Sequence, residues 1–178
     1  MASLQDLVFL PRPRKITARA GRLAADDLRR IVVRGNPADT LGPALRLQDA
    51  GRDYAGVSWT VRAGDGTPDG PGCAVLELDP HAGLPAQGYR LKITSRGMHL
   101  RAPDAAGLFY GVMTLRQLWR QTGGFLPAGV IEDHPDFPVR GVMLDVSRDK
   151  VPTLDTLFAL VDQLAEWKIN HLELYTEH

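Results

Sequence analysis

Hydrophobic and polar side chains alternate most regularly near the middle of the chain. Residues 89–94 alternate apolar with basic or polar side chains, and residues 98–101 repeat the pattern after Ser95-Arg96-Gly97. A period of two on both sides of a turn predicts a hairpin of amphipathic strands. One face of the hairpin is apolar and the other is basic. An antiparallel sheet with one covered face is therefore expected.

A long amphipathic helix is predicted after this hairpin, from Pro103-Asp104 to about Gln121. Its apolar residues recur at helical spacing, and Gly123-Gly124 follows as a stop signal. Gly107 and Gly111 lie four residues apart, which allows close approach to a neighbouring element. Earlier apolar runs predict strands at residues 31–33, 57–61 and 73–79 and a short helix at residues 39–50.

The pattern changes after residue 125. Residues 126–139 contain Pro127, Pro135 and Pro138, which predicts an irregular linker and a domain boundary. An apolar strand at 142–146, a helix capped by Thr153 and a second apolar strand at 169–175 then form one βαβ unit. The predicted domains are thus residues 1–125 and 140–178. A single βαβ unit cannot bury both sheet faces, so the sequence looks cut from a longer α/β protein.

Composition excludes several classes of function. The 178 residues contain 21 Lys and Arg against 21 Asp and Glu, so the net charge is zero and a nucleic-acid partner is not expected. No apolar run approaches the roughly 20 residues that cross a bilayer, and the N-terminus lacks a signal-peptide pattern. We therefore expect a soluble chain with no membrane partner; the sequence does not specify a compartment.

No metal or cofactor site is predicted. Cys73 is the only cysteine, which rules out an intrachain disulfide and argues against a thiolate-based metal site. Glu132, Asp133, His134 and Asp136 form an acidic cluster with one histidine. Their spacing is crowded and interrupted by proline, so part of a linker explains them as well as a metal site does.

Residues that could carry chemistry follow the first strand of the βαβ unit. Asp145, Ser147, Arg148 and Asp149 cluster where this strand ends. Loops at the carboxyl ends of parallel strands converge on one crevice, which is where α/β proteins place their sites. The guanidinium of Arg148 suits recognition of hydroxyl or carboxylate groups. The alternative is an ordinary ion pair between Asp145 and Arg148.

A second polar stretch, Glu173 to His178, ends the next strand and should face the same crevice. Tyr175, Glu177 and His178 are candidates for lining a site, where they would bind a polar ligand or act as acid and base. The alternative is that these residues form a solvated chain end.

Two motifs of this chain are distinctive. Residues 140–148 read RGVMLDVSR, and residues 107–118 read GLFYGVMTLRQL. They resemble two motifs of family 20 glycoside hydrolases, the β-N-acetylhexosaminidases: the R-G-x-M-L-D-x-S-R of the first barrel strand and the G-x-x-x-G-x-x-T-L-x-Q-L of a helix in the accessory domain. Lys168-Ile169-Asn170 also matches the start of the second barrel strand. The resemblance is strong over residues 88–174.

The resemblance implies a fold and a reaction. The fold is an α+β accessory domain, with an antiparallel-rich sheet covered by helices, followed by the first βαβ unit of a truncated (β/α)8 TIM barrel. The reaction removes terminal β-linked N-acetylhexosamine: the 2-acetamido oxygen attacks the anomeric carbon, a Glu is the acid/base and an Asp orients the acetamide. By this resemblance Arg148 binds sugar hydroxyls and Asp145 shapes the same region. The Asp-Glu pair belongs to a later strand that this chain does not contain, so we expect the chain itself to be inactive.

Two departures from the family pattern indicate a divergent branch. Asp149 stands where a His usually follows the arginine, and residues 174–178 (LYTEH) replace a Trp-His-Leu-Thr-Asp-Asp run. One alternative function is a non-catalytic carbohydrate-binding or domain-packing module. Another is a fragment of a related barrel glycosidase, O-GlcNAcase-like or α-glucuronidase-like, against which the motif at 140–148 argues. An N-acetylhexosamine-terminated glycan is the expected partner of the complete protein, and unpaired edges at 141–175 predict self-association of this chain.

Overall fold

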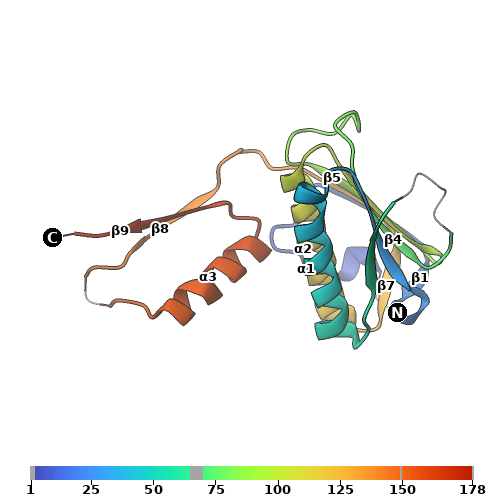
Figure 1. Ribbon diagram of the computed structural model, residues 1–178, viewed down its shortest axis with the longest axis horizontal. Helices are drawn as coiled ribbons and strands as arrows, with labels where there is room; N and C mark the ends of the chain where they lie inside the picture. Colours follow the sequence, from blue (N-terminus) through green and yellow to red (C-terminus); the bar gives the residue numbers. More distant parts are fainter. Residues whose placement is uncertain (1–2, 65–69, 149, 178) are drawn as a thin grey trace. The chain divides into compact units, whose positions relative to one another are not determined.

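The computed structural model describes residues 3–64, 70–148 and 150–177, which divide after Pro135 into two compact units. The first unit is a sheet with two α-helices, and the second is a βαβ unit (Figure 1). Within the described residues, no helix is long and apolar enough to cross a membrane.

The sheet of the first unit has seven strands in the order β1-β7-β5-β6-β4-β2-β3. They are β1 (Lys15–Ala24), β2 (Arg30–Arg34), β3 (Thr60–Ala63), β4 (Cys73–Leu78), β5 (Tyr89–Thr94), β6 (Gly97–Ala102) and β7 (Phe125–Asp133). Pairing is antiparallel from β1 to β6 and parallel from β6 to β3. The predicted α+β class, the hairpin β5-β6 and the antiparallel part of the sheet are confirmed. The parallel part was not predicted.

Both α-helices of this unit cover the same face of the sheet (Figure 1). Helix α1 (Pro37–Ala55) is capped by Asn36, whose side chain accepts the N–H of Ala38, and helix α2 (Ala105–Thr122) by Asp104. Helix α1 is longer than the predicted 39–50, because the cap at Asn36 and Pro37 at its first position begin it earlier. Two short 3₁₀ turns, Leu4–Asp6 and Ala25–Asp27, complete the unit.

One apolar core lies between the sheet and these two helices. At its centre Trp59 and Trp119 are fully buried, with ring centroids 5.8 Å apart. The indole N–H of Trp59 donates to the carbonyl of Ala25 at 3.3 Å. Among the described residues, the indole nitrogen of Trp119 has no hydrogen-bond partner. Among the described residues, the indole N–H of Trp59 is therefore hydrogen-bonded and that of Trp119 is not.

The glycine pair of α2 brings the helix against the sheet, as its spacing predicts. A Cβ on Gly107 would lie 2.1 Å from the carbonyl oxygen of Gly88, just before β5. A Cβ on Gly111 would lie 2.3 Å from a methyl carbon of Leu100 on β6. Real Cβ atoms do not approach other atoms so closely, so only glycine permits this packing.

Polar residues of the same helix motif hold the helix to other elements. The hydroxyl of Thr114 lies 2.6 Å from that of Tyr89, and burial raises the pKa of Tyr89 well above its ordinary value. The amide of Gln117 accepts the N–H of Leu10 at 3.0 Å and donates to its carbonyl at 2.7 Å. Gln121 does the same to Val8, at 2.9 and 2.7 Å. The extended segment before β1 is thus bound along α2 by two glutamines. Each side-chain amide pairs with the N–H and the carbonyl of one residue, as the backbone of an adjacent strand would.

The prediction that residues 126–139 form a linker is wrong for its first part. Residues 125–133 are strand β7, which lies between β1 and β5 in the sheet. Pro127 is compatible with this strand, because pairing with β5 covers only Gly129–Asp133 and the register with β1 shifts beside it. The break between the two units comes later, after Pro135.

The second unit has the predicted strand–helix–strand order: β8 (Gly141–Asp145), α3 (Leu154–Glu166) and β9 (His171–Tyr175), with β8 and β9 parallel. The hydroxyl of Thr153 caps α3 by accepting the N–H of Thr156. Arg140 donates from Nε to the carbonyl of Lys168 at 2.8 Å, and Asn170 accepts the N–H of Arg140 at 2.8 Å. These contacts align the starts of the two strands. That this unit begins a barrel stays a prediction.

Candidate functional site

The predicted site residues lie at the carboxyl ends of β8 and β9. Asp145 is the last residue of β8 and pairs in register with Tyr175, the last residue of β9. The N–H of Val146 donates to the carbonyl of Tyr175 at 3.0 Å, which extends the pairing by one bond. Two loops therefore leave the sheet side by side, as the βαβ pattern predicts.

Asp145 organises the loop after β8. Its Oδ1 accepts the N–H and the hydroxyl of Ser147, both at 2.9 Å, and the N–H of Arg148 at 3.3 Å. Its Oδ2 accepts from Nε of Arg148 at 2.6 Å. Each carboxylate oxygen is thus engaged by the chain that follows, and the loop closes around this side chain.

Arg148 joins this loop to the one that follows β9. Its Nε lies 2.6 Å from Asp145 Oδ2 and 2.9 Å from Glu177 Oε2, and its guanidinium lies 5.8 Å from the ring centroid of Tyr175. In the part of the chain that the structure describes, Nη1 and Nη2 donate no hydrogen bond. Among these residues the arginine is therefore held at Nε, and its two terminal nitrogens keep their donors for a ligand.

Ser147 forms a second link between the two loops, which the sequence did not reveal. Its hydroxyl donates to Asp145 Oδ1 and accepts the N–H of Glu177 at 2.7 Å. The spacing of two residues between Asp145 and Ser147 at the strand end was the only sequence signal for this link. Serine has both a donor and an acceptor, so it satisfies both loops at once.

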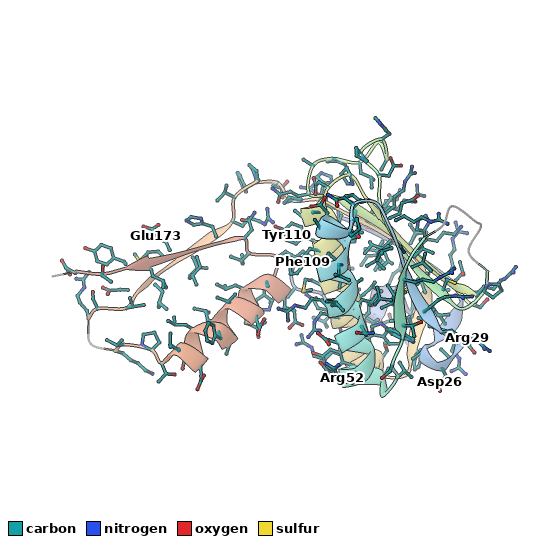
Figure 2. All side chains as sticks on the ribbon, in the orientation of Figure 1. Asp26, Arg29, Arg52, Phe109, Tyr110 and Glu173 are labelled. Carbon is teal, nitrogen blue, oxygen red and sulfur yellow. The ribbon has the colours of Figure 1, made fainter. Side chains whose placement is uncertain are left out.

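The structure brings together Asp145, Arg148, Tyr175 and Glu177. The alternative ion pair between Asp145 and Arg148 is present, but Arg148 also contacts Glu177 and Tyr175. Glu173, labelled in Figure 2, lies inside β9 opposite Met143 and takes no part in these contacts. Asp149 and His178 lie outside the described residues. The binding roles of these residues remain predictions.

The electrostatics of the cluster favour the ionised form of Asp145. The pKa of Asp145 is held well below its ordinary value, mainly by the hydrogen bond from the N–H of Ser147 and next by the guanidinium of Arg148. The cluster therefore keeps both its anion and its cation at neutral pH. It can present guanidinium donors to hydroxyl groups, and the carboxylate of Glu177 can accept from them.

This shift predicts how the cluster responds to acid. A lowered folded-state pKa contributes stability above the ordinary pKa of aspartate, and this contribution is lost as pH falls through the lower folded value. By carbon NMR, we expect Asp145 to be still ionised at about pH 3, where most free aspartate is protonated. In Arg148→Gln its pKa should rise only part of the way, since the Ser147 N–H remains. Titration of Asp145 at its ordinary pKa in the unaltered chain would contradict the described contacts.

The acidic cluster near Pro135 does not form a metal site. Glu132 pairs with Lys15 at 3.1 Å and with Arg90 at 3.2 Å, and Asp133 accepts the N–H of Arg14. Over residues 3–64, 70–148 and 150–177, no three His, Cys, Asp or Glu side chains are grouped to hold a metal.

Comparisons with known proteins place this geometry in a family context. Residues 8–134 match Glycosyl hydrolase family 20, domain 2. The beta-hexosaminidase of Akkermansia muciniphila is 42% identical over 52% of this chain and 19% of its own length. That of Porphyromonas gingivalis is 31% identical over 91% of this chain and 21% of its own length. The chain thus spans about a fifth of these relatives.

Solved structures give the same result. The GH20 beta-N-acetylhexosaminidase of Streptomyces coelicolor A3(2) matches with a TM-score of 0.78 and 28% identity, over 94% of this chain and 34% of that one. A mutant Streptomyces plicatus beta-hexosaminidase in complex with its product GlcNAc matches with a TM-score of 0.76 and 29% identity, over 94% of this chain and 34% of that one.

Proposed function

The chain belongs to glycosyl hydrolase family 20, and from this premise we propose that the complete protein removes terminal β-linked N-acetylhexosamine from glycans. Hydrolysis proceeds with retention, through attack of the substrate's own 2-acetamido oxygen. Residues up to Pro135 supply the accessory domain, and residues from Asp136 onward supply the first βαβ unit of the catalytic barrel. Matches over 94% of the chain, which include both units, support this division.

The observation that carries the proposal is the position of the Arg148 side chain and the contacts that hold it. The side chain stands in the loop after β8, where its Nε donates to Asp145 and forms an ion pair with Glu177. Among the described residues its terminal nitrogens donate no hydrogen bond, so their donors are left for hydroxyl groups. Guanidinium groups restrained in this way lose little entropy on binding a sugar. In the proposal Arg148 binds hydroxyls of the terminal sugar, while Asp145, Ser147 and Glu177 position it.

The proposal predicts that this chain alone hydrolyses nothing. The proposed acid/base and the residue that orients the acetamide belong to a later barrel strand, and without them the attack has no catalyst. A chromogenic N-acetyl-β-glucosaminide incubated with the pure chain should be cleaved no faster than in buffer, while the complete protein turns it over. Turnover by the pure chain that Arg148→Ala abolishes would overturn the proposal.

The βαβ unit exposes apolar side chains that a barrel would cover. Met143, Phe158 and Leu174 are 59%, 64% and 48% exposed, and Val142 and Val161 are also exposed. Such surfaces and the open edges of β8 and β9 recruit other chains. We therefore expect this chain to self-associate, with an average mass in sedimentation that rises with concentration. Phe158→Lys should reduce the association, whereas a monomer over a wide concentration range would count against an uncovered face.

A further inference from the structure

The face of the seven-stranded sheet that α1 and α2 leave uncovered is basic. Strand register places Val32, Val75, His99 and Lys92 in one row across β2, β4, β6 and β5. The hairpin alternation predicts a basic face but gives no ligand for it. On this face Val32 and Val75 form a small buried cluster with Cys73, separate from the main core.

A hollow of about 520 Å³ opens on this face. Cys73 and Val75 contribute apolar lining, and Arg34, Lys92, Arg96 and His99 contribute nitrogen donors. Of the described residues that line the hollow, none is acidic and none is Phe, Tyr or Trp. An apolar floor with converging donors is typical of a ligand site, and these donors select an anion.

The basic side chains of this hollow differ in whether a carboxylate lies beside them. Glu77 lies 2.8 Å from His99 and 3.9 Å from Arg34. Among the residues that the structure describes, no carboxylate lies within 4 Å of the side chain of Lys92 or Arg96. Both side chains are exposed. They therefore supply the positive charge that a ligand would meet.

A second hollow of about 370 Å³ continues the first. Pro71 and Arg96 line both, and the second also has Asp27, Arg29 and Ser95 in its lining. Arg29 is labelled in Figure 2. A ligand that follows both hollows is longer than one anionic group and meets Arg96 near its middle. An extended chain with a charged substituent fits this shape better than a free ion.

We propose that these two hollows bind an acidic glycan, with a sulfate ester or carboxylate of one sugar held between Lys92 and Arg96. The oxyanion takes charge-assisted hydrogen bonds from both cations, and the hydroxyls of the next sugar reach Ser95 and Asp27. The described lining contains no Phe, Tyr or Trp, the large rings on which a neutral sugar stacks, and this argues against a neutral sugar. The choice of a glycan over an acidic peptide rests on the proposed function.

Calorimetry on the 178-residue chain tests this site. The probes are a sulfated tetrasaccharide, an unsulfated uronate-containing tetrasaccharide and neutral chitotetraose. We expect one or both acidic probes to bind, which identifies the anion, and the neutral probe not to bind. Lys92→Gln/Arg96→Gln should weaken binding at least tenfold without changing the melting temperature. Arg52→Gln is the matched control, because Arg52 lies on α1 on the opposite face (Figure 2).

Three results would overturn the site. They are no binding of either acidic probe, equal binding by the double variant and by Arg52→Gln, and equally tight binding of a glutamate peptide of the same charge. The last result would indicate a surface for acidic proteins instead. This measurement does not depend on hydrolysis, so loss of the proposed function in the complete protein would leave its outcome unchanged.

Discussion

Arg148→Ala in the complete protein is expected to lower kcat/KM by about one and a half to three and a half decades. Removing a charged group that hydrogen-bonds a buried substrate costs about 2–5 kcal/mol, part of which comes from the unpaired groups left behind. Here those groups include Asp145 and Glu177, both within 3 Å of Nε. Steady-state kinetics on a chromogenic N-acetyl-β-glucosaminide measures the loss.

Lysine at this position should restore little activity. An ammonium cannot be held at one nitrogen while it presents two others in a fixed plane. Lys150→Gln removes a nearby exposed cation and should change kcat/KM by no more than a few-fold. If Arg148 only stabilises the strand end, Arg148→Ala and Arg148→Lys will lower the melting temperature while kcat/KM per folded molecule stays near normal. That result would exclude the proposed role in binding substrate.

Trp119→Ala is expected to cost about 3–5 kcal/mol of unfolding free energy, because it empties the centre of a close-packed core. Trp119 of α2 is fully buried and packs against Trp59, so little can collapse into the space. A domain of this size has a total stability of about 5–15 kcal/mol, so the variant should be partly unfolded at 37 °C. Urea unfolding followed by circular dichroism measures the change.

Replacing each tryptophan by phenylalanine tests how much the hydrogen bond of each indole contributes to stability. Trp119→Phe removes a buried N–H that has no partner among the described residues, which offsets part of the lost packing. Trp59→Phe instead removes a satisfied hydrogen bond, at a cost of about 0.5–1.5 kcal/mol, while the carbonyl of Ala25 keeps the N–H of Leu28 as a donor. We therefore expect Trp59→Phe to be the more destabilising of the two. The reverse order would show that the indole of Trp119 finds a partner in solution.

Sequence patterns predicted those elements of the fold whose signals are local. The hairpin, helix α2 with its glycine stop and the βαβ order all follow from alternation, helical spacing and caps. Strand β7 was missed because Pro127 and Pro135 resemble linker residues. Its assignment depends on β1 and β5, which lie far away in the sequence. The parallel pairing of β2, β4 and β6 was missed for the same reason.

For the candidate site, the sequence predicted which residues lie close together but not the contacts between them. Strand ends placed Asp145, Arg148, Tyr175 and Glu177 at one edge without any knowledge of contacts. The bridge from Ser147 to Glu177 depends on the exact path of two loops, which the strand pattern does not determine. The basic hollow depends on cross-strand register, which joins residues from four strands.

The place of β7 between β1 and β5 also has a consequence for synthesis. Among the described residues, strand β1 pairs with β7 alone, so Lys15 meets its partner Glu132 after more than a hundred further residues have been made. At about 5–20 residues per second, β1 leaves the ribosome roughly 5–20 s before β7 can join it. During that interval β1 is an open strand edge. Its exposed Lys15, Arg19 and Arg22 are the kind of charged residues that discourage pairing between nascent chains on neighbouring ribosomes.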